Sequence, residues 1–386
     1  MSKKILGIVL VCMVLLTGVF LPGSRPASAG DDEVLDLTLE KAIAIAMEKN
    51  ADVNLAKIGV KKAEKGLDEA ESAADKSEDS DSPFGPTGYE KALIERVAPR
   101  QAQMGLTVAQ KTLEATKNGT KLAVENVYYD VLKARTELEN AGDAVKRAEE
   151  RLRLANVSLE AGTAARLDVI NAEVVLAQKK VRLNAAENTY KSKVMEFNKT
   201  LGLPLSTKIN LTSSFEFKPV EIDLEKVIAE AKESDVAYVG AQEALAVAEK
   251  QFAEAKKFYT PNVYKYREAQ YAYEEAKLNA EKAERDLVMD IKNAYFKLQS
   301  ARESYEAMQK GVEQAQEAYR LTKLRSEIGM STQIELQEAS DRLDEARAEL
   351  LSALYNYNLA TAQFRYGIFG FSGTSASSSG MMAGGM

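Results

Sequence analysis

The chain has 386 residues, of which 28% are charged; it has no histidine, a single cysteine and a formal net charge of −7. This composition excludes an intrachain disulfide and the usual ligand sets of zinc and haem, so no metal and no cofactor are expected. The acidic balance also argues against nucleic-acid partners, whose phosphates require surfaces rich in Lys and Arg.

Residues 1–29 have the composition of a secretory signal peptide. Two lysines precede an apolar run from Ile5 to Leu21, and a small-x-small sequence ends at Ala29. This order predicts cleavage before Gly30, with a retained membrane anchor as the alternative. Cleavage removes three positive charges and changes the net charge from −7 to −10. The signal peptide predicts export, so we expect the mature protein in the cell envelope or periplasm. No later segment approaches the ~18 apolar residues of a spanning helix, so no helix of the mature protein is expected to cross a membrane.

The front of the mature chain is predicted to be helical and occurs twice. Residues 37–70 correspond to residues 222–255 at an offset of 185, whereas the long helices that follow repeat at an offset of 167. The difference leaves 18 additional residues in the first copy. They fall within Ser72–Ala98, an acidic segment with several turn-forming residues that we predict to be a loop.

A helix of about 60 residues is predicted from Pro99 to Glu160, and it would be ~90 Å long. Its apolar residues follow the 3-4 spacing of a left-handed coiled coil, and the second copy repeats this spacing in register. The positions in the first copy are Val131, Ala134, Leu138, Ala141, Val145, Ala148, Leu152, Ala155 and Leu159. Those in the second are Leu298, Ala301, Tyr305, Met308, Val312, Ala315 and Tyr319.

A glycine interrupts each repeat directly after its long helix. Gly162 and Gly329 are 167 residues apart, and each is followed by a second run with 3-4 spacing. Glycine takes the left-handed conformation at little cost, so a long helix stops there and the chain reverses. The runs that return are Val169, Ala172, Leu176, Leu183, Ala186, Tyr190 and Phe197, and Leu336, Ala339, Leu343, Ala346, Leu350, Ala353, Tyr357, Ala360 and Phe364.

The predicted fold is therefore all-α, with two long coiled-coil-like α-hairpins made by duplication. Residues 30–203 form the first hairpin repeat and residues 222–369 the second. Residues 204–221 link them, and the alternation of apolar residues there suggests one short strand. The tail, residues 370–386, consists of Gly, Ser, Ala and Met with one Phe and one Thr and is expected to be disordered.

Several of these segments together resemble the TolC-type outer-membrane efflux family. They are LTLEKAIAIAMEKN near the mature N-terminus, NVYYDVLKAR and AGTAARLDVINAE in the first repeat, and NAYFKLQSAR and IGMSTQIELQEA in the second. The resemblance implies a homotrimer whose helices close into a hollow α-barrel, with a periplasmic adaptor protein at the hairpin tips and an inner-membrane pump. It implies a passive duct for small-molecule or protein substrates, associated with an outer membrane where one is present.

The resemblance also assigns roles to residues at the tips. Glu335 and Glu338, one helical turn apart after Gly329, would form acidic rings at the tunnel entrance, and Asp168 is the first-repeat equivalent of Glu335. Such rings attract cations and could bind a divalent ion through oxygen ligands. Solvated surface carboxylates are the alternative. The tips that the adaptor would meet are Gly162, Leu167, Gly329 and Ile334.

The sequence departs from the family where β-barrel strands would be inserted before each long helix. Neither Ser72–Ala98 nor the segment from Lys256 has the alternation of a barrel strand, so little or no barrel is expected. The second segment instead contains closely spaced tyrosines. We predict that the pairs Tyr264/Tyr271 and Tyr266/Tyr273 are helix-seam contacts, with an interfacial aromatic belt as the alternative.

Three functions remain open from the sequence. The first is the trimeric efflux or secretion duct, and the second is a structural spacer of the cell envelope that conducts nothing. The third is an adaptor, which the presence of two hairpins and the scarcity of strands disfavour. An enzyme is not expected, because the chain has no nucleophile elbow, no phosphate-binding glycine loop and no histidine for acid–base chemistry.

Overall fold

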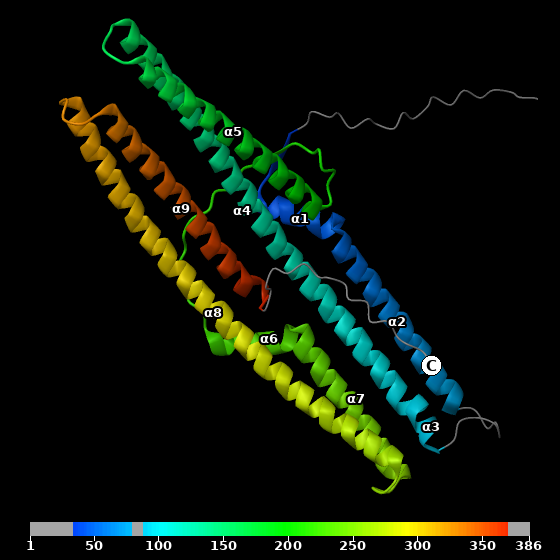
Figure 1. Cartoon of the computed structure of the whole chain (residues 1–386). Coiled ribbons are helices and arrows are strands. Elements are labelled where there is room, and N and C mark those ends of the chain that lie inside the picture. The colour runs from blue at the N-terminus through cyan, green and yellow to red at the C-terminus, as the bar shows by residue number, and fades with distance from the viewer. Residues whose placement is uncertain (1–33, 79–87, 370–386) are drawn as a thin grey trace, which may run out of the picture.

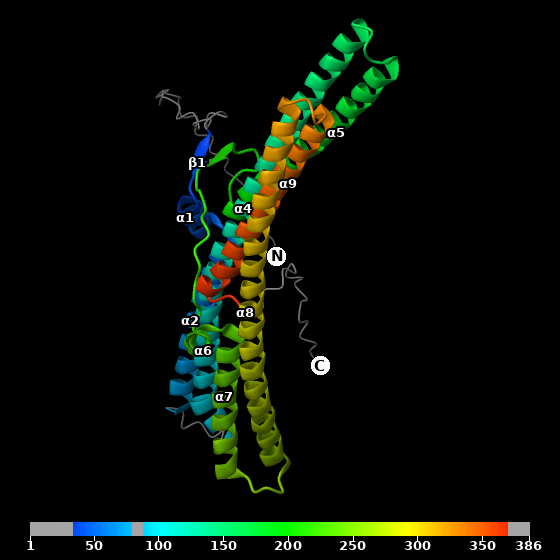
Figure 2. The same ribbon diagram turned by 90° about the vertical axis from the view of Figure 1, so that its left-hand side faces the viewer.

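The computed structural model describes residues 34–78 and 88–369, and two long helical hairpins dominate it (Figure 1). Their two tips lie at the same end of an elongated rod (Figure 2). In chain order the elements are β1 (Leu35–Leu37), α1 (Leu39–Lys49), α2 (Ala51–Glu78), α3 (Gly88–Ala92), the π-helix η1 (Leu93–Val97), α4 (Ala98–Glu160), α5 (Arg166–Leu201), β2 (Ile209–Leu211), α6 (Leu224–Ser234), α7 (Val236–Phe258), α8 (Tyr264–Glu327) and α9 (Gln333–Tyr366).

The predicted long helices are confirmed. Helix α4 has 63 residues and α8 has 64, and each is followed by a tip and a returning helix, α5 or α9. At 1.5 Å per residue each long helix extends over ~95 Å. This pairing gives the predicted fold of two long helical hairpins.

The predicted seams hold each hairpin together. Every apolar position that the 3-4 spacing selects on α4, α5, α8 and α9 is buried or half-buried. On α4 the best-buried of them is Val131, at 1% exposure, and on α9 it is Tyr357, also at 1%. This packing keeps the two helices of each hairpin side by side.

The two repeats meet around a compact core near the middle of the rod. Strands β1 and β2 pair in parallel, with Leu35 opposite Ile209 and Leu37 opposite Leu211. The Tyr128 hydroxyl of α4 donates a hydrogen bond to the Leu37 carbonyl (2.9 Å) and accepts one from the Ser213 amide (3.0 Å). The short strand expected in the linker is thus present as β2, and these bonds tie the linker to α4.

The loop prediction for Ser72–Ala98 is largely wrong. Helix α2 continues to Glu78, and α3 and η1 lead from Gly88 directly into α4; residues 79–87 lie outside the described residues. The segment before Glu78 contains Ala73 and Ala74, and the Ser77 hydroxyl donates to Glu95 of η1 (3.2 Å), so helix propensity and this contact outweigh its serines and aspartates. The π-helix ends just before Pro99, which has no amide hydrogen to continue a ladder behind it.

The tyrosine pairs behave differently from each other. Tyr266 and Tyr273 pack on Phe252 of α7, with ring centroids 5.3 and 5.8 Å away, which confirms the predicted seam contact. Tyr264 and Tyr271 are 75% and 61% exposed, so the same prediction is wrong for them within a single chain.

None of the described helices has the length and apolarity required to cross a bilayer. The predicted signal cleavage between Ala29 and Gly30 and the tail lie outside the described residues.

Candidate functional site at the hairpin tips

Both tips are built on a glycine with a left-handed backbone. Gly162 has φ 74° and Gly329 has φ 73°. In each turn the residue after the glycine donates its amide to a carbonyl five residues back: Thr163 to Ser158 (2.9 Å) and Met330 to Arg325 (2.8 Å). These bonds satisfy carbonyls that the helix end leaves open, which is the reason for a positive φ at this position.

The apolar residues just after the turns are exposed in the single chain. Leu167 is 64% exposed and its repeat equivalent Ile334 is 51% exposed. A Cβ atom added to either glycine would have no heavy atom within 4 Å. The tips therefore present an open surface of glycine and aliphatic side chains within the described chain.

The acids predicted for the entrance have a local role in starting the returning helices. The Asp168 carboxylate accepts the Ala165 amide (2.9 Å), and the Glu335 carboxylate accepts the Thr332 amide (2.8 Å). The Ser331 hydroxyl also donates to Glu335 (2.6 Å). Both acids thus bind back to the residue that precedes their helix, as in a capping box. The equal spacing from glycine to acid in the two repeats is therefore explained by the capping of the returning helix.

The hydrogen bonds lower the pKa of the Glu335 carboxyl. The Ser331 hydroxyl contributes most, and the Thr332 amide adds to the effect. Glu335 therefore carries its full negative charge at neutral pH. Glu338, one turn further, is exposed and forms a long ion pair with Arg342 (3.9 Å). The two carboxylates do not share a ligand within the described part of the chain, so a ring would need further copies.

A groove runs between the two hairpins behind the tips. Two of the predicted tip residues, Ile334 and Glu338, line it from α9, and Arg147 lines it from α4. The other predicted residues, Gly162, Leu167, Asp168, Gly329 and Glu335, lie outside it. The remaining lining residues come from α4, α5 and α9: Ala144, Ala148, Glu150, Arg151, Leu154, Val175, Lys179, Gln337 and Asp341.

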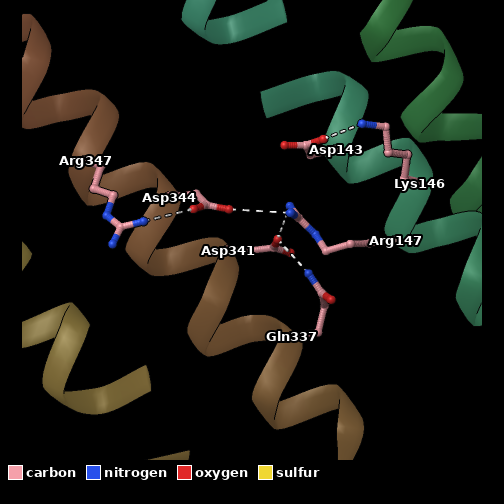
Figure 3. Close-up of polar contacts among 7 residues, drawn as sticks. All are labelled: Asp143, Lys146, Arg147, Gln337, Asp341, Asp344 and Arg347. Carbon is pink, nitrogen blue, oxygen red and sulfur yellow. Dashed lines mark hydrogen bonds and ion pairs between the residues drawn. The ribbon is translucent and has the colours of Figure 1, made fainter. Parts of the chain in front are cut away.

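An ion-pair network closes this groove and holds the hairpins together (Figure 3). Arg147 of α4 binds Asp341 at 2.9 Å and reaches Asp344 at 3.6 Å, both on α9. Gln337 donates to the same Asp341 oxygen (2.9 Å). In Figure 3, Arg147 points from α4 toward Asp341 and Asp344 on α9. This network fixes the distance between the hairpins near their tips.

Sequence analysis missed the network, although the duplication contains a signal for it. At the offset of 167 the equivalent of Arg147 is Gln314, and the equivalent of Asp341 is Val174. A charge that one repeat has and the other lacks indicates a contact that only one repeat makes within the chain. Among the described residues no cluster of three or more His, Cys, Asp or Glu side chains could hold a metal ion.

Comparison with known proteins identifies the kind of fold. Residues 258–366 match a family described as Outer membrane efflux protein, which confirms the resemblance found in the sequence. Comparison with curated proteins finds no match.

Three solved structures show how far the fold extends. A membrane protein from Pseudomonas aeruginosa aligns with TM-score 0.68 and 11% identity, over 85% of this chain and 93% of that one. The Campylobacter jejuni CmeC outer membrane channel aligns with TM-score 0.66 and 14% identity, over 85% of each chain. The Vibrio cholerae outer membrane protein VceC aligns with TM-score 0.65 and 15% identity, over 86% of this chain and 96% of that one.

Proposed function

We propose that this chain is one subunit of a passive trimeric duct in the cell envelope, because residues 258–366 match the outer membrane efflux family and 85–86% of the chain aligns with solved outer-membrane proteins. In this proposal an inner-membrane pump and a periplasmic adaptor work with the duct, and small molecules or proteins pass through it. The proposal rests on one observation: apolar faces of α5 and α8 are exposed, whereas the equivalent faces of α9 and α4 in the other repeat are packed against each other.

Within the chain, α9 of the second repeat packs across α4 of the first. Tyr355 stacks on Tyr129 with ring centroids 4.8 Å apart. Asp341 binds Arg147 nearer the tips. Leu122 and Tyr129 on this face of α4 are only 5% and 2% exposed. The contact is thus a well-packed interface between repeats, and duplication should offer a second one.

The faces for that second interface are open in a single chain. At the offset of 167, Leu122 and Tyr129 correspond to Met289 and Phe296 of α8, which are 55% and 61% exposed. The face of α9 corresponds to a face of α5 that holds exposed apolar residues at the spacing of a helix seam: Leu167, Ile170, Val174 and Val181, at 64%, 45%, 51% and 70% exposure.

A second copy of the chain satisfies both faces, because its α8 can pack on α5 as α4 packs on α9. This contact joins different surfaces of the two copies, and repeating it closes a ring when the rotation allows. Six hairpins around an axis would enclose a lumen lined by the polar helix faces. Apolar seams of this length would otherwise be exposed to water, which argues for assembly.

A cysteine crosslink tests this assembly. Asn188 of α5 and Phe296 of α8 are the equivalents of the stacked Tyr355 and Tyr129, and the sequence after Cys12 has no cysteine. We expect the Asn188→Cys/Phe296→Cys chain, treated with a short bis-maleimide, to give a ladder that ends at three subunits. Particle images of the same sample should show a central lumen. Each single-cysteine chain is the control and should stay monomeric in the denaturing gel.

Other ladders would contradict the proposal in different ways. A ladder ending at two subunits would replace the ring with a dimer, and an unending ladder would indicate an open filament. No crosslink, together with a monomeric mass by light scattering, would defeat the duct and favour a rod-like spacer.

We also propose that Glu335 and Glu338 form the acidic rings at the entrance of the duct, and that Gly162, Leu167, Gly329 and Ile334 shape the tips that an adaptor meets. Asp168 would add one further charge per subunit. The depressed pKa of Glu335 supports a charged ring at neutral pH. Three copies of two carboxylates around a narrow mouth would bind multivalent cations through their oxygens.

The rings can be tested without disturbing the helix start, because glutamine at Glu335 keeps the capping bonds. We expect Glu335→Gln/Glu338→Gln to weaken calcium binding to the assembled protein at least tenfold, measured by titration calorimetry. The matched control is Glu313→Gln/Glu317→Gln on α8, which should bind calcium as the unmodified chain does. Equal binding by the ring variant would show that these glutamates are ordinary surface charges.

A further inference from the structure

A groove opens between the end of α5 and the linker that follows it, and we call it the linker groove. Its lining residues are Tyr190, Lys191, Val194 and Met195 of α5 and the linker residues Leu205, Ser206, Thr207, Lys208 and Ile209. The linker wall is held in place by Asn198, which is fully buried and donates to the carbonyls of Leu205 (3.2 Å) and Thr207 (2.9 Å). Met195 and Leu205 are 45% and 54% exposed, so the groove presents apolar surface with a fixed shape.

Strand β1 begins beside this groove. Leu35 lies opposite Ile209, and the Leu35 amide donates to the Lys208 carbonyl (2.9 Å). Residues 30–33, which precede β1, lie outside the described residues. Partners advance together along a parallel pair of strands, so the same register would place Glu33 opposite Thr207 and Asp32 opposite Ser206. The chain before β1 is therefore aligned with the linker wall of the groove.

The duplication indicates the same position independently. Tyr190 in the groove corresponds to Tyr357 of α9 at the offset of 167, and Tyr357 is only 1% exposed. The Tyr357 hydroxyl accepts the Val220 amide (3.1 Å) and donates to the Lys218 carbonyl (3.0 Å). At the offset of 185 that relates the front helices, residues 218–220 correspond to residues 33–35. The segment that would cover Tyr190 is thus the one that the strand register selects.

The charges of the segment and the groove are complementary. Residues 30–33 have the sequence GDDE, with three acids, whereas the described residues that line the groove include two lysines and no acid. Lys191 forms a long, exposed ion pair with Glu187 (3.8 Å), and such a pair contributes little. The neighbouring Glu196 is bound by Lys193 (2.9 Å). The groove therefore offers a basic surface to an acidic segment.

We propose that residues 31–33 dock in the linker groove of their own chain as a continuation of β1, with their carboxylates beside Lys191 and Lys208. Extending the ladder adds a bond from the Glu33 amide to the Ser206 carbonyl and one from the Lys208 amide to the Glu33 carbonyl. Because Gly30 is the expected first residue of the mature chain, the segment that signal cleavage exposes would fasten the N-terminus to the linker between the repeats. The inference goes beyond the proposed duct and does not depend on it.

Hydrogen exchange tests the added ladder bonds by comparing the mature chain, residues 30–386, with residues 34–386. We expect the Lys208 amide to exchange at least about tenfold faster in the shorter chain, because its acceptor has been removed. The control is the Thr212 amide, which donates to the Leu37 carbonyl (3.1 Å) at the other end of the same ladder and should exchange equally in both chains. Equal rates at Lys208, or an equal acceleration at Thr212, would overturn the docking.

Fluorescence quenching tests the role of charge, because the chain contains no tryptophan. In the Leu205→Trp chain, we expect quenching by neutral acrylamide to rise about twofold when Asp31→Asn/Asp32→Asn/Glu33→Gln is added, since the released segment uncovers the ring. The matched control, Asp31→Glu/Asp32→Glu/Glu33→Asp, keeps the charge and should leave quenching unchanged. Protection that survives neutralisation would overturn the ion-pair assignment. Protection lost on dilution would assign the groove to the N-terminus of a second copy and also overturn the proposal.

Discussion

Replacing Gly202 by alanine should destabilise the fold by about 2–5 kcal/mol, the largest effect expected of any glycine in residues 34–78 and 88–369. Gly202 ends α5 with φ 73°, a conformation that costs other residues free energy. An added Cβ would also lie 2.7 Å from the Lys49 carbonyl oxygen, at the end of α1. The Lys49 carbonyl belongs to the backbone of α1 and Gly202 to the backbone at the end of α5, so the clash can be relieved only by separating the two helices. The urea midpoint of the helical circular-dichroism signal measures the effect.

Gly162→Ala separates the two causes. Gly162 has nearly the same φ, 74°, but a Cβ there would meet nothing within 4 Å. We expect a loss of about 1–2 kcal/mol, from the backbone conformation alone. If both variants lost the same amount, the close approach to Lys49 would not contribute to stability. The hairpin tip would then matter as much as the central core.

Replacing Glu125 by alanine should cost about 2–4 kcal/mol, because a buried acid then leaves its partners without bonds. Glu125 of α4 is 1% exposed. It accepts hydrogen bonds from the hydroxyls of Tyr129 (2.7 Å) and Tyr366 (3.3 Å), and Arg365 lies 3.7 Å away. Tyr366 and Arg365 belong to the end of α9, so the change loosens the contact between repeats. Urea unfolding and hydrogen exchange of residues 360–366 measure it.

Glu125→Gln separates charge from hydrogen bonding through pH. Burial raises the pKa of the Glu125 carboxyl above its ordinary value of 4.5, although the Tyr129 hydroxyl opposes the shift. The folded state therefore holds this proton more tightly than the unfolded state does. The resulting stabilisation is present below pH 4.5 and is lost as the pH rises through the folded-state pKa.

The free energy of unfolding of the unmodified chain, minus that of Glu125→Gln, should therefore be larger at pH 4.5 than at pH 7.5. The comparison cancels groups that titrate in both proteins. Unfolding curves of the two proteins at both pH values give the difference directly. A difference that is independent of pH would mean that the carboxyl titrates normally, with Arg365 fully offsetting its burial.

Helix length and hairpin topology were predictable because they depend on local periodicity. The 3-4 spacing from Val131 to Leu159 and its repeat from Leu298 indicated long helices with one packed seam, and the structure has both. Gly162 and Gly329 marked the reversals because only glycine takes a positive φ there at little cost. Their equal distance to Asp168 and Glu335 also reflects local chemistry, since each acid caps the helix that follows.

Contacts between helices were less predictable. Seam periodicity treated Tyr264/Tyr271 and Tyr266/Tyr273 alike, yet only the second pair faces α7. A seven-residue repeat identifies residues that share one face of a helix. It does not identify which neighbouring helix, if any, covers that face. The loop prediction for the acidic segment before Glu78 was wrong for a related reason: the contact between Ser77 and Glu95 of η1 stabilises a helix that the composition of the segment only weakly favours.

The sequence by itself therefore determined a duplicated pair of long hairpins, their turning points and the resemblance to an efflux family. Each of these depends on residues close together in the chain or on comparison of one repeat with the other. Only the tertiary structure decided that Arg147 meets Asp341, that Glu125 is buried beside Tyr366, and that the α5 and α8 faces stay open. Those features depend on how α9 lies across α4, and side chains almost 200 residues or more apart in the chain come together only when that crossing forms.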